Sequence, residues 1–385
     1  MARSSRTPAA LLAAALAVAG AGCDDVPSDA IEDCSASQVI PGAVATDILF
    51  VIDDSGSMAG EQATLQAGLA AFINDLAASP IANDYQIGVT TTSVVDFATA
   101  DDGTSGGDLV SPGIMRPTPG DPNALISAFQ GAVVVGTSGS SREQPFTAAR
   151  RAIEKSAVSG SPNFGFVRPG AKLAVIFLSD EDDCSGAAAL GSDAECQAER
   201  TASPSRLVAI SDVVSALSAG GAREVVAAAI VGVAPTSLDL LCVTAAVCGG
   251  GPTVSCPTCC DTARYPGYRF VDLLGALGQG SSRLASICDP SFDQALRDFA
   301  TVILSQTLPL EGAPADPRLL VAHVDRGATS IPCTIASADA DAATRNAADA
   351  VYEPPLAGRP ASLTFQNDCA LEQGDRVFVD VVCVG

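Results

Sequence analysis

A D-x-S-x-S pattern that begins at Asp53 places three oxygen-bearing side chains at alternate positions, directly after an apolar run of residues. A carboxylate and two hydroxyls with this spacing could bind a hard divalent cation, because Mg2+ and Ca2+ prefer oxygen ligands and Mg2+ needs a near-octahedral shell. Asp53 would supply negative charge, while Ser55 and Ser57 would supply neutral oxygens. We expect Gly56 to let the backbone curl so that both hydroxyls face the ion.

The elements that must position these residues alternate along the chain. Residues 46–53 and 172–180 are apolar runs that end in polar residues, which is typical of buried parallel strands. Residues 61–78 have apolar side chains at three- and four-residue spacing, which predicts an amphipathic helix. This alternation predicts an α/β fold with a doubly wound, mostly parallel sheet and helices on both faces. Further strands are expected over 85–93, 224–233 and 284–288, and further helices over 143–158, 205–219, 270–277 and 291–306.

The sequence pattern changes at about Pro314. From there, short strand-like runs alternate with segments rich in Asp, Gly and Pro, as turns require. We therefore expect a small β-rich domain over 315–385. The α/β domain is expected to cover 46–310 and to contain a cysteine-rich insertion at 234–265.

The segment FVIDDSGSM, the helix after it and the strand IFLSD together resemble a von Willebrand factor type A (VWA) domain with its metal-ion-dependent adhesion site. The resemblance spans roughly residues 46–308. It implies that Mg2+, Mn2+ or Ca2+ binds at the top of the sheet, with Asp180 matching the acidic residue that usually reaches the ion through water. It also implies that the ion captures a carboxylate from a partner protein at an open coordination position.

One ligand of that family does not match cleanly. The family places a Thr in a loop before its third main helix, where this chain reads VGTSGSSREQPFTAARRAIE. Counting back from the helix favours the hydroxyls of Ser140 and Ser141, or Glu143, over Thr137 or Thr147. A glutamate there would shift the ion preference toward Ca2+ or Mn2+.

The sequence therefore predicts metal ligands from three places: the turn after the first strand, the acidic end of the strand over 172–180, and the loop before the helix over 143–158, where several residues are possible. The acidic run at 179–183 could instead be a solvated loop in which only Asp180 faces an ion. The predicted metal ligands are Asp53, Ser55, Ser57, Asp180, Ser141 and Glu143.

The charge balance excludes several classes of partner. Acidic residues outnumber basic ones 44 to 21, for a formal net charge of -23. Binding of nucleic acid or of an anionic bilayer draws its affinity from clustered Lys and Arg, so neither is expected here. The single histidine, His323, argues against histidine-based catalysis or a multi-histidine metal site, and we expect a protein that is not an enzyme.

The N-terminus has the pattern of an export signal. Arg3 and Arg6 precede an apolar stretch too short to span a bilayer, and small residues lead to Cys23. This resembles the lipobox of bacterial lipoproteins, although Gly20 stands where an aliphatic residue is usual. We expect a lipoprotein signal peptide at 1–22 and a flexible tether at 23–45, with the acylated Cys23 as the sole membrane contact at the bacterial cell envelope. An ordinary signal peptide cut nearby is the alternative.

The cysteine count agrees with export. Of 13 cysteines, 12 remain once Cys23 is set aside, an even number that is compatible with six disulfides. Cys184 and Cys196 bracket a short polar loop and are expected to pair. The run from Cys256 to Cys260 could be half of a zinc knuckle, but disulfides are the better interpretation outside the cytosol.

These observations lead to one main hypothesis and two alternatives. The main hypothesis is a surface-anchored binding or adhesion protein whose divalent metal captures a protein ligand. The first alternative is a structural envelope protein with no ligand capture. The second, a metal-dependent hydrolase, is weaker because no base or nucleophile stands near the metal motif in the sequence.

Overall fold

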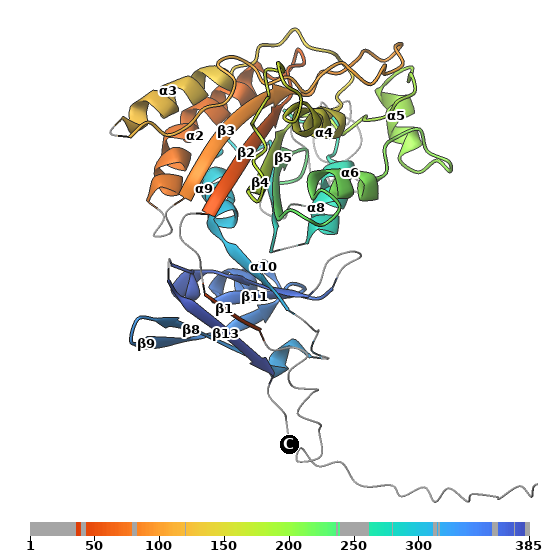
Figure 1. Cartoon of the computed structure of the whole chain (residues 1–385). Helices are drawn as coiled ribbons and strands as arrows, with labels where there is room; N and C mark the ends of the chain where they lie inside the picture. Colours follow the sequence, from red (N-terminus) through yellow and green to blue (C-terminus); the bar gives the residue numbers. More distant parts are fainter. Residues whose placement is uncertain are drawn as a thin grey trace, which may run out of the picture.

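The computed structural model describes residues 36–39, 44–78, 83–119, 121–235, 238, 262–278, 280–310, 314, 316–355, 361–372 and 374–381. The chain forms an α/β unit and a smaller β-rich unit, which lie one above the other in Figure 1. This arrangement confirms the predicted fold class. The predicted signal peptide, Cys23 and most of the cysteine-rich insertion lie outside the described residues.

The α/β unit is built on a five-stranded sheet in the order β3-β2-β4-β5-β6, and every neighbouring pair is parallel. All side chains of β4 and β5 are buried, as expected of strands covered on both faces. The strands are β2 (Val44–Ile52), β3 (Asn83–Thr91), β4 (Lys172–Leu178), β5 (Val225–Val231) and β6 (Ser282–Ser286).

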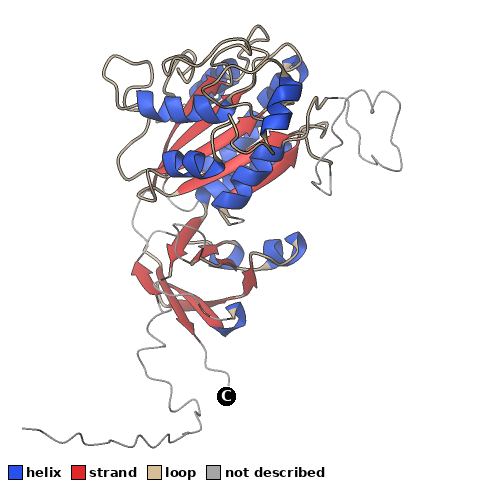
Figure 2. Cartoon of the chain, turned by 90° about the vertical axis from the view of Figure 1, so that its right-hand side faces the viewer, coloured by secondary structure: helices blue, strands red, loops and turns tan. Residues whose placement is uncertain are grey.

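Helices cover both faces of this sheet (Figure 2). Alternate strand residues point to opposite sides, so Phe50 packs with α2, α3 and α9, whereas Val51 packs with α4, α6 and α8. The helices are α2 (Ala59–Ala77), α3 (Pro122–Ala132), α4 (Pro145–Lys155), α5 (Asp193–Glu199), α6 (Ile210–Leu217), α8 (Tyr268–Leu277) and α9 (Asp293–Leu304).

The strand order has one reversal point, and it lies between β2 and β4. The chain passes from β2 to β3 on one side, then crosses over to β4 on the other side of β2. In open α/β sheets, ligands bind in the crevice beyond the carboxyl ends of the strands at this position. Asp53 follows β2 and Asp180 follows β4 closely, so the topology brings these two predicted ligands to the same crevice.

The β-rich unit consists of two four-stranded sheets, β1-β13-β8-β9 and β10-β11-β12-β7, which share one apolar core. Two of their strands come from outside 315–385: β1 lies within the segment expected to be a tether, and β7 follows α9 directly. The elements are β1 (Ala36–Val39), β7 (Gln306–Pro309), β8 (Leu320–Arg326), β9 (Thr329–Cys333), β10 (Ile335–Ser337), α10 (Ala342–Ala347), β11 (Ala350–Glu353), β12 (Ser362–Phe365) and β13 (Arg376–Val381), with short 3-10 turns at Pro317–Leu319 and Asn367–Cys369.

The structure corrects one expected helix and adds three. The helix expected over 205–219 is shorter, because Val208 donates its backbone N–H to the Ser185 carbonyl oxygen and only Ile210–Leu217 is helical. Helices α3, α5 and α10 were not expected. Among the described residues, no helix combines the length and the apolar composition that crossing a membrane would require.

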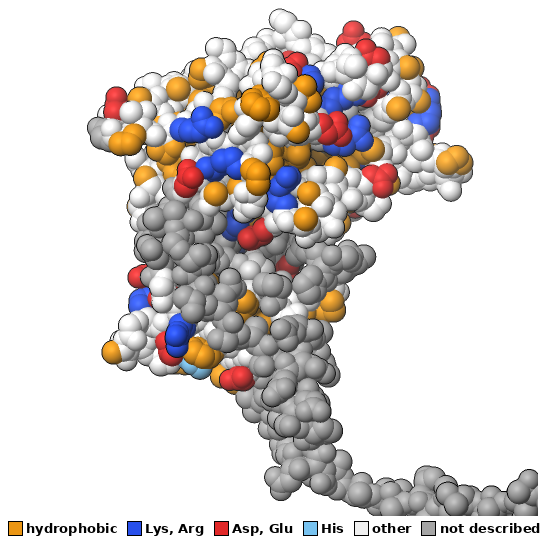
Figure 3. Space-filling model, in the orientation of Figure 1, with side chains coloured by type: hydrophobic (Ala, Val, Ile, Leu, Met, Phe, Trp, Pro, Cys, Tyr) orange, Lys and Arg blue, Asp and Glu red, His pale blue; other side chains and the backbone are white. Residues whose placement is uncertain are grey.

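Charged side chains of both signs are interspersed on the face of the α/β unit seen in Figure 3. The excess of acidic residues is therefore not gathered into one large patch on that face. Some of the acidic residues are instead buried at the carboxyl end of the sheet, where the candidate site lies.

Candidate functional site

The turn after β2 holds the Asp53 carboxylate in a fixed, fully buried position. Its Oδ1 accepts a hydrogen bond from the Ser55 N–H at 2.8 Å, and its Oδ2 accepts one from the Ser179 hydroxyl at 2.6 Å. Burial raises the pKa of Asp53, although the hydrogen bonds from Ser179 and Ser55 oppose the rise. The carboxylate is therefore fixed at the carboxyl ends of β2 and β4, where open α/β sheets have their ligand-binding crevice.

The two serines of the turn lie together. The Ser55 and Ser57 hydroxyl oxygens are 3.3 Å apart, and Ser55 is buried while Ser57 is half-buried. The expected role of Gly56 was wrong: it does not adopt a positive φ, and a Cβ added there would meet no atom within 4 Å. The turn thus converges its hydroxyls without needing the freedom of glycine.

Asp180 is buried at the end of β4, with 1% of its surface exposed. Neither of its carboxylate oxygens has a hydrogen-bond partner among the described residues. The Arg264 guanidinium forms a long ion pair with Asp180, with the Nε 3.7 Å from Oδ2. Burial, and then the neighbouring charge of Asp53, raise the pKa of Asp180 to about 7. A buried carboxylate that accepts no hydrogen bond is stabilised when a cation binds to it.

Glu143 is the loop residue that the structure brings close to Asp53. It is 1% exposed; its Oε2 accepts a hydrogen bond from the Thr92 hydroxyl at the end of β3, and its Oε1 has no partner among the described residues. Burial, and then the charge of Asp53, raise the pKa of Glu143 well above its ordinary value. Its backbone is fixed as well, because the neighbouring Gln144 N–H donates to the Thr92 carbonyl oxygen at 3.1 Å.

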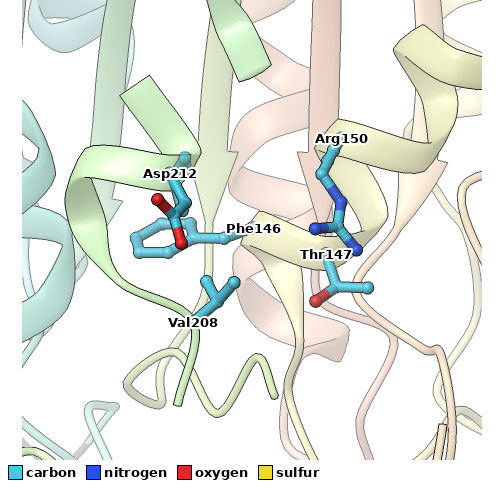
Figure 4. A pocket seen from close by; sticks show the side chains of 6 residues that line it. Phe146, Thr147, Arg150, Val208 and Asp212 are labelled. Atoms are coloured by element: carbon cyan, nitrogen blue, oxygen red, sulfur yellow. The ribbon is translucent and has the colours of Figure 1, made fainter. Parts of the chain in front are cut away.

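The other loop candidates lie elsewhere. Ser141 and Thr137 are exposed, and the Ser140 hydroxyl donates to the Val95 carbonyl oxygen. Thr147 lines a small pocket between α4 and α6, beside Arg150 (Figure 4). Of the alternatives that the sequence left open, Glu143 therefore has the geometry most suited to a ligand.

The acidic run after β4 is not a solvated loop, since all of its members are buried. Asp183 accepts a hydrogen bond from the Arg269 Nε at 2.8 Å, and Asp182 accepts one from the Arg269 N–H at 2.9 Å. Burial raises the pKa of Asp182 to about 7 and that of Glu181 to about 9. The run is a structured part of the crevice wall.

Three residues that the sequence analysis missed complete the arrangement. Ser179 binds Asp53 directly, as described above. Gln62 of α2 donates its Nε2 to the carbonyl oxygens of Asp53 at 2.9 Å and Gly136 at 2.8 Å, so it joins the turn to the loop that leads to Glu143. Gly139 of this loop packs so closely that an added Cβ would lie 2.3 Å from the Asp54 Cγ. Gln62 could have been found as a polar residue on the apolar face of its helix.

The residues present fit a divalent cation only if hydroxyls take part. Among the residues that the structure describes, no three carboxylate, thiol or imidazole groups are placed to hold an ion. Asp53, Asp180 and Glu143 nevertheless lie at one end of the sheet, with three buried carboxylate oxygens that have no hydrogen-bond partner there. The Ser55 and Ser57 hydroxyls stand beside them, and this mixed oxygen set is of the type that Mg2+, Mn2+ and Ca2+ bind.

The remaining predicted residues have other roles. Cys184 and Cys196 form the expected disulfide, and Cys333 pairs with Cys369 in the β-rich unit. His323 stacks on Phe378 within the β8–β13 pair, away from the α/β unit. Cys23 and the cysteines from 242 to 260 lie outside the described residues.

No protein-family model matches the chain, and no curated protein matches it. Among solved structures, the chain is similar to proximal thread matrix protein 1 from the mussel byssus (11% identity, 70% of this chain and 51% of that one, TM-score 0.35). It is also similar to the pilus adhesin SpaC from Lactobacillus rhamnosus GG (13%, 88% and 38%, 0.39) and to the human COPII-coat protein Sec24c (10%, 91% and 46%, 0.41). The chain spans about half the length of these proteins or less.

Proposed function

We propose that this protein is a surface-anchored binding or adhesion protein, with a VWA-like domain that captures a ligand through a divalent metal. The ion would be Mg2+, Mn2+ or Ca2+, held in the crevice between β2 and β4. Asp53, Ser55 and Ser57 would hold it from the turn, Asp180 from the end of β4 and Glu143 from the loop before α4. Ser141, which is exposed, is the less favoured loop ligand.

The observation that carries the proposal is the buried carboxylate of Asp180 at the reversal point of the sheet. Neither of its oxygens has a hydrogen-bond partner in the part of the chain that the structure describes, and its ion pair with the exposed Arg264 is 3.7 Å long. A folded protein rarely buries an ionised carboxylate without hydrogen bonds or a nearby cation, because the lost hydration of each such group costs on the order of several kcal/mol. A cation bound by Asp180 and by the neighbouring hydroxyls would remove that cost. The ion would supply an open coordination position for an oxygen of a partner.

Capture is favoured over hydrolysis by the residues around the crevice. A metal-dependent hydrolase needs a base or a nucleophile in addition to its metal ligands. The single histidine of the sequence lies in β8 of the β-rich unit. Asp53, Asp180 and Glu143 would themselves hold the ion, and Asp182 and Asp183 are engaged by Arg269. A protein partner that offers a carboxylate is the ligand that the VWA resemblance implies.

The location at the envelope rests on the sequence alone. An acylated Cys23 would anchor the chain, and a surface exposed beyond the membrane is where an adhesion site would meet its partner. A structural envelope protein without ligand capture is the competing function, and it is favoured if the site proves to bind no ion.

The test is a titration of the full-length, chelator-treated protein with Mg2+, Mn2+ and Ca2+, followed by calorimetry. We expect one saturable site in the wild type and none in Asp53→Ala. Asp75→Ala, which removes a carboxylate from the far end of α2, is the matched control and should bind like the wild type. A pull-down from envelope extracts, with metal and with chelator, then tests capture. Identical titrations of wild type and Asp53→Ala would overturn the metal site.

A further inference from the structure

Arg264 lies beside the candidate site, and both its backbone and its side chain interact with Asp180. The N–H groups of Arg264 and Tyr265 donate to the Asp180 carbonyl oxygen at 2.8 and 3.0 Å. The Arg264 Nε lies 3.7 Å from the Asp180 Oδ2. The backbone of Arg264 is therefore held next to a candidate metal ligand.

The side chain of Arg264 is much more exposed than that of Asp180. It is 58% exposed, whereas the Asp180 side chain is 1% exposed. The guanidinium therefore approaches the buried carboxylate from solvent, at a distance too long for a hydrogen bond.

A divalent ion at the crevice and the Arg264 guanidinium would both be attracted to Asp180, and they would repel each other. We infer that Arg264 is an affinity-determining residue, a tethered cation that occupies Asp180 when the metal is absent and competes with it when present. Its exposure leaves room for the guanidinium to turn into solvent while the backbone bonds stay in place. This inference rests on the proposed function, because it assumes that the crevice binds an ion.

Metal binding to three variants tests the competition. We expect full-length Arg264→Ala to bind Mn2+ roughly fivefold more tightly than the wild type, since one partly exposed charge has an effect of about this size. Arg264→Lys keeps the charge and should lie close to the wild type. Arg297→Ala removes an exposed arginine from α9 of the same unit and should leave the affinity unchanged.

Stability in chelator tests the ion pair without any metal. Arg264→Ala should lower the melting temperature in EDTA, and this loss should largely disappear in an Asp180→Asn background. Coupling in EDTA without metal binding by any variant would overturn the proposed function, and the inference with it. Metal binding that Arg264→Ala leaves unchanged or weakens would overturn the inference alone.

Discussion

Replacing Asp53 by asparagine should stabilise the metal-free protein and at the same time remove its response to divalent ions. The amide has the size of the carboxylate, and its oxygen can still accept the Ser55 N–H. The Ser179 hydroxyl, which now donates to Asp53, also lies 3.1 Å from the Glu181 carbonyl oxygen and can donate there. The substitution therefore removes a charge and little else.

The size of the effect follows from the acids that surround Asp53. The rise in the pKa of Asp180 from 3.8 to about 7 corresponds to roughly 4 kcal/mol for keeping that carboxylate ionised. Burial is the largest cause and the charge of Asp53 is the next. Removing this charge should therefore raise the free energy of unfolding in EDTA at neutral to mildly alkaline pH by about 1–2 kcal/mol.

In contrast to this gain in stability in EDTA, the stabilisation by added metal should be lost in Asp53→Asn. At an ion concentration of about 100 times Kd, binding stabilises the wild type by about 2.7 kcal/mol, which raises Tm by roughly 3–5 °C at the usual unfolding entropy of a chain of this size. The Tm of Asp53→Asn should stay flat over the same titration. Urea unfolding in EDTA and thermal melts with and without Mn2+ measure both effects, with Asp75→Asn as the control. A variant that is destabilised in EDTA, or that responds to Mn2+ like the wild type, would refute the reasoning.

Three further predictions concern the anchor, the cysteines and the loop before α4. The wild type should partition into membranes and Cys23→Ser should be released, so equal partitioning would contradict the lipid anchor. Under denaturing conditions without reductant, few or no thiols should react with an alkylating reagent; labelling of most cysteines would favour metal-bound thiols instead. Gly139→Ala should weaken metal binding several-fold, because its Cβ would meet Asp54 and displace the loop that holds Glu143. Gly60→Ala, where an added Cβ meets no atom within 4 Å, is its control and should bind normally.

The sheet could be predicted because its strands carry their own signal. Strands buried on both faces must be apolar at every position, so β4 and β5 are visible as continuous apolar runs. The unexpected helix α5 also had a local signal: Ser192 caps it by accepting the Glu195 N–H, and a Ser followed three residues later by Glu is typical of a helix start. Helix α3 begins with Asp121 as its cap and a proline in its first turn.

The site was harder to predict because its contacts join distant parts of the chain. The Asp53 turn could be recognised from five consecutive residues, but its fixed geometry depends on Ser179, which is 126 residues away. Glu143 depends likewise on Thr92, 51 residues earlier. No local pattern shows which hydroxyl or carboxylate of a loop will turn inward, so the sequence left Ser140, Ser141 and Glu143 open.

The choice of a glutamate at the loop position bears on what the site can bind. The carboxylates of Asp53 and Glu143, if both are ionised and both contact the ion, would already balance its two positive charges, and Asp180 adds a third carboxylate beside them. Little net attraction then remains for a carboxylate of the partner. The net charge of -23 opposes the approach of an acidic partner as well. The open coordination position, and not long-range attraction, must then provide most of the affinity. We therefore expect a partner whose carboxylate is surrounded by basic side chains, since only such a surface would be attracted to this chain while still offering an acidic ligand to its metal.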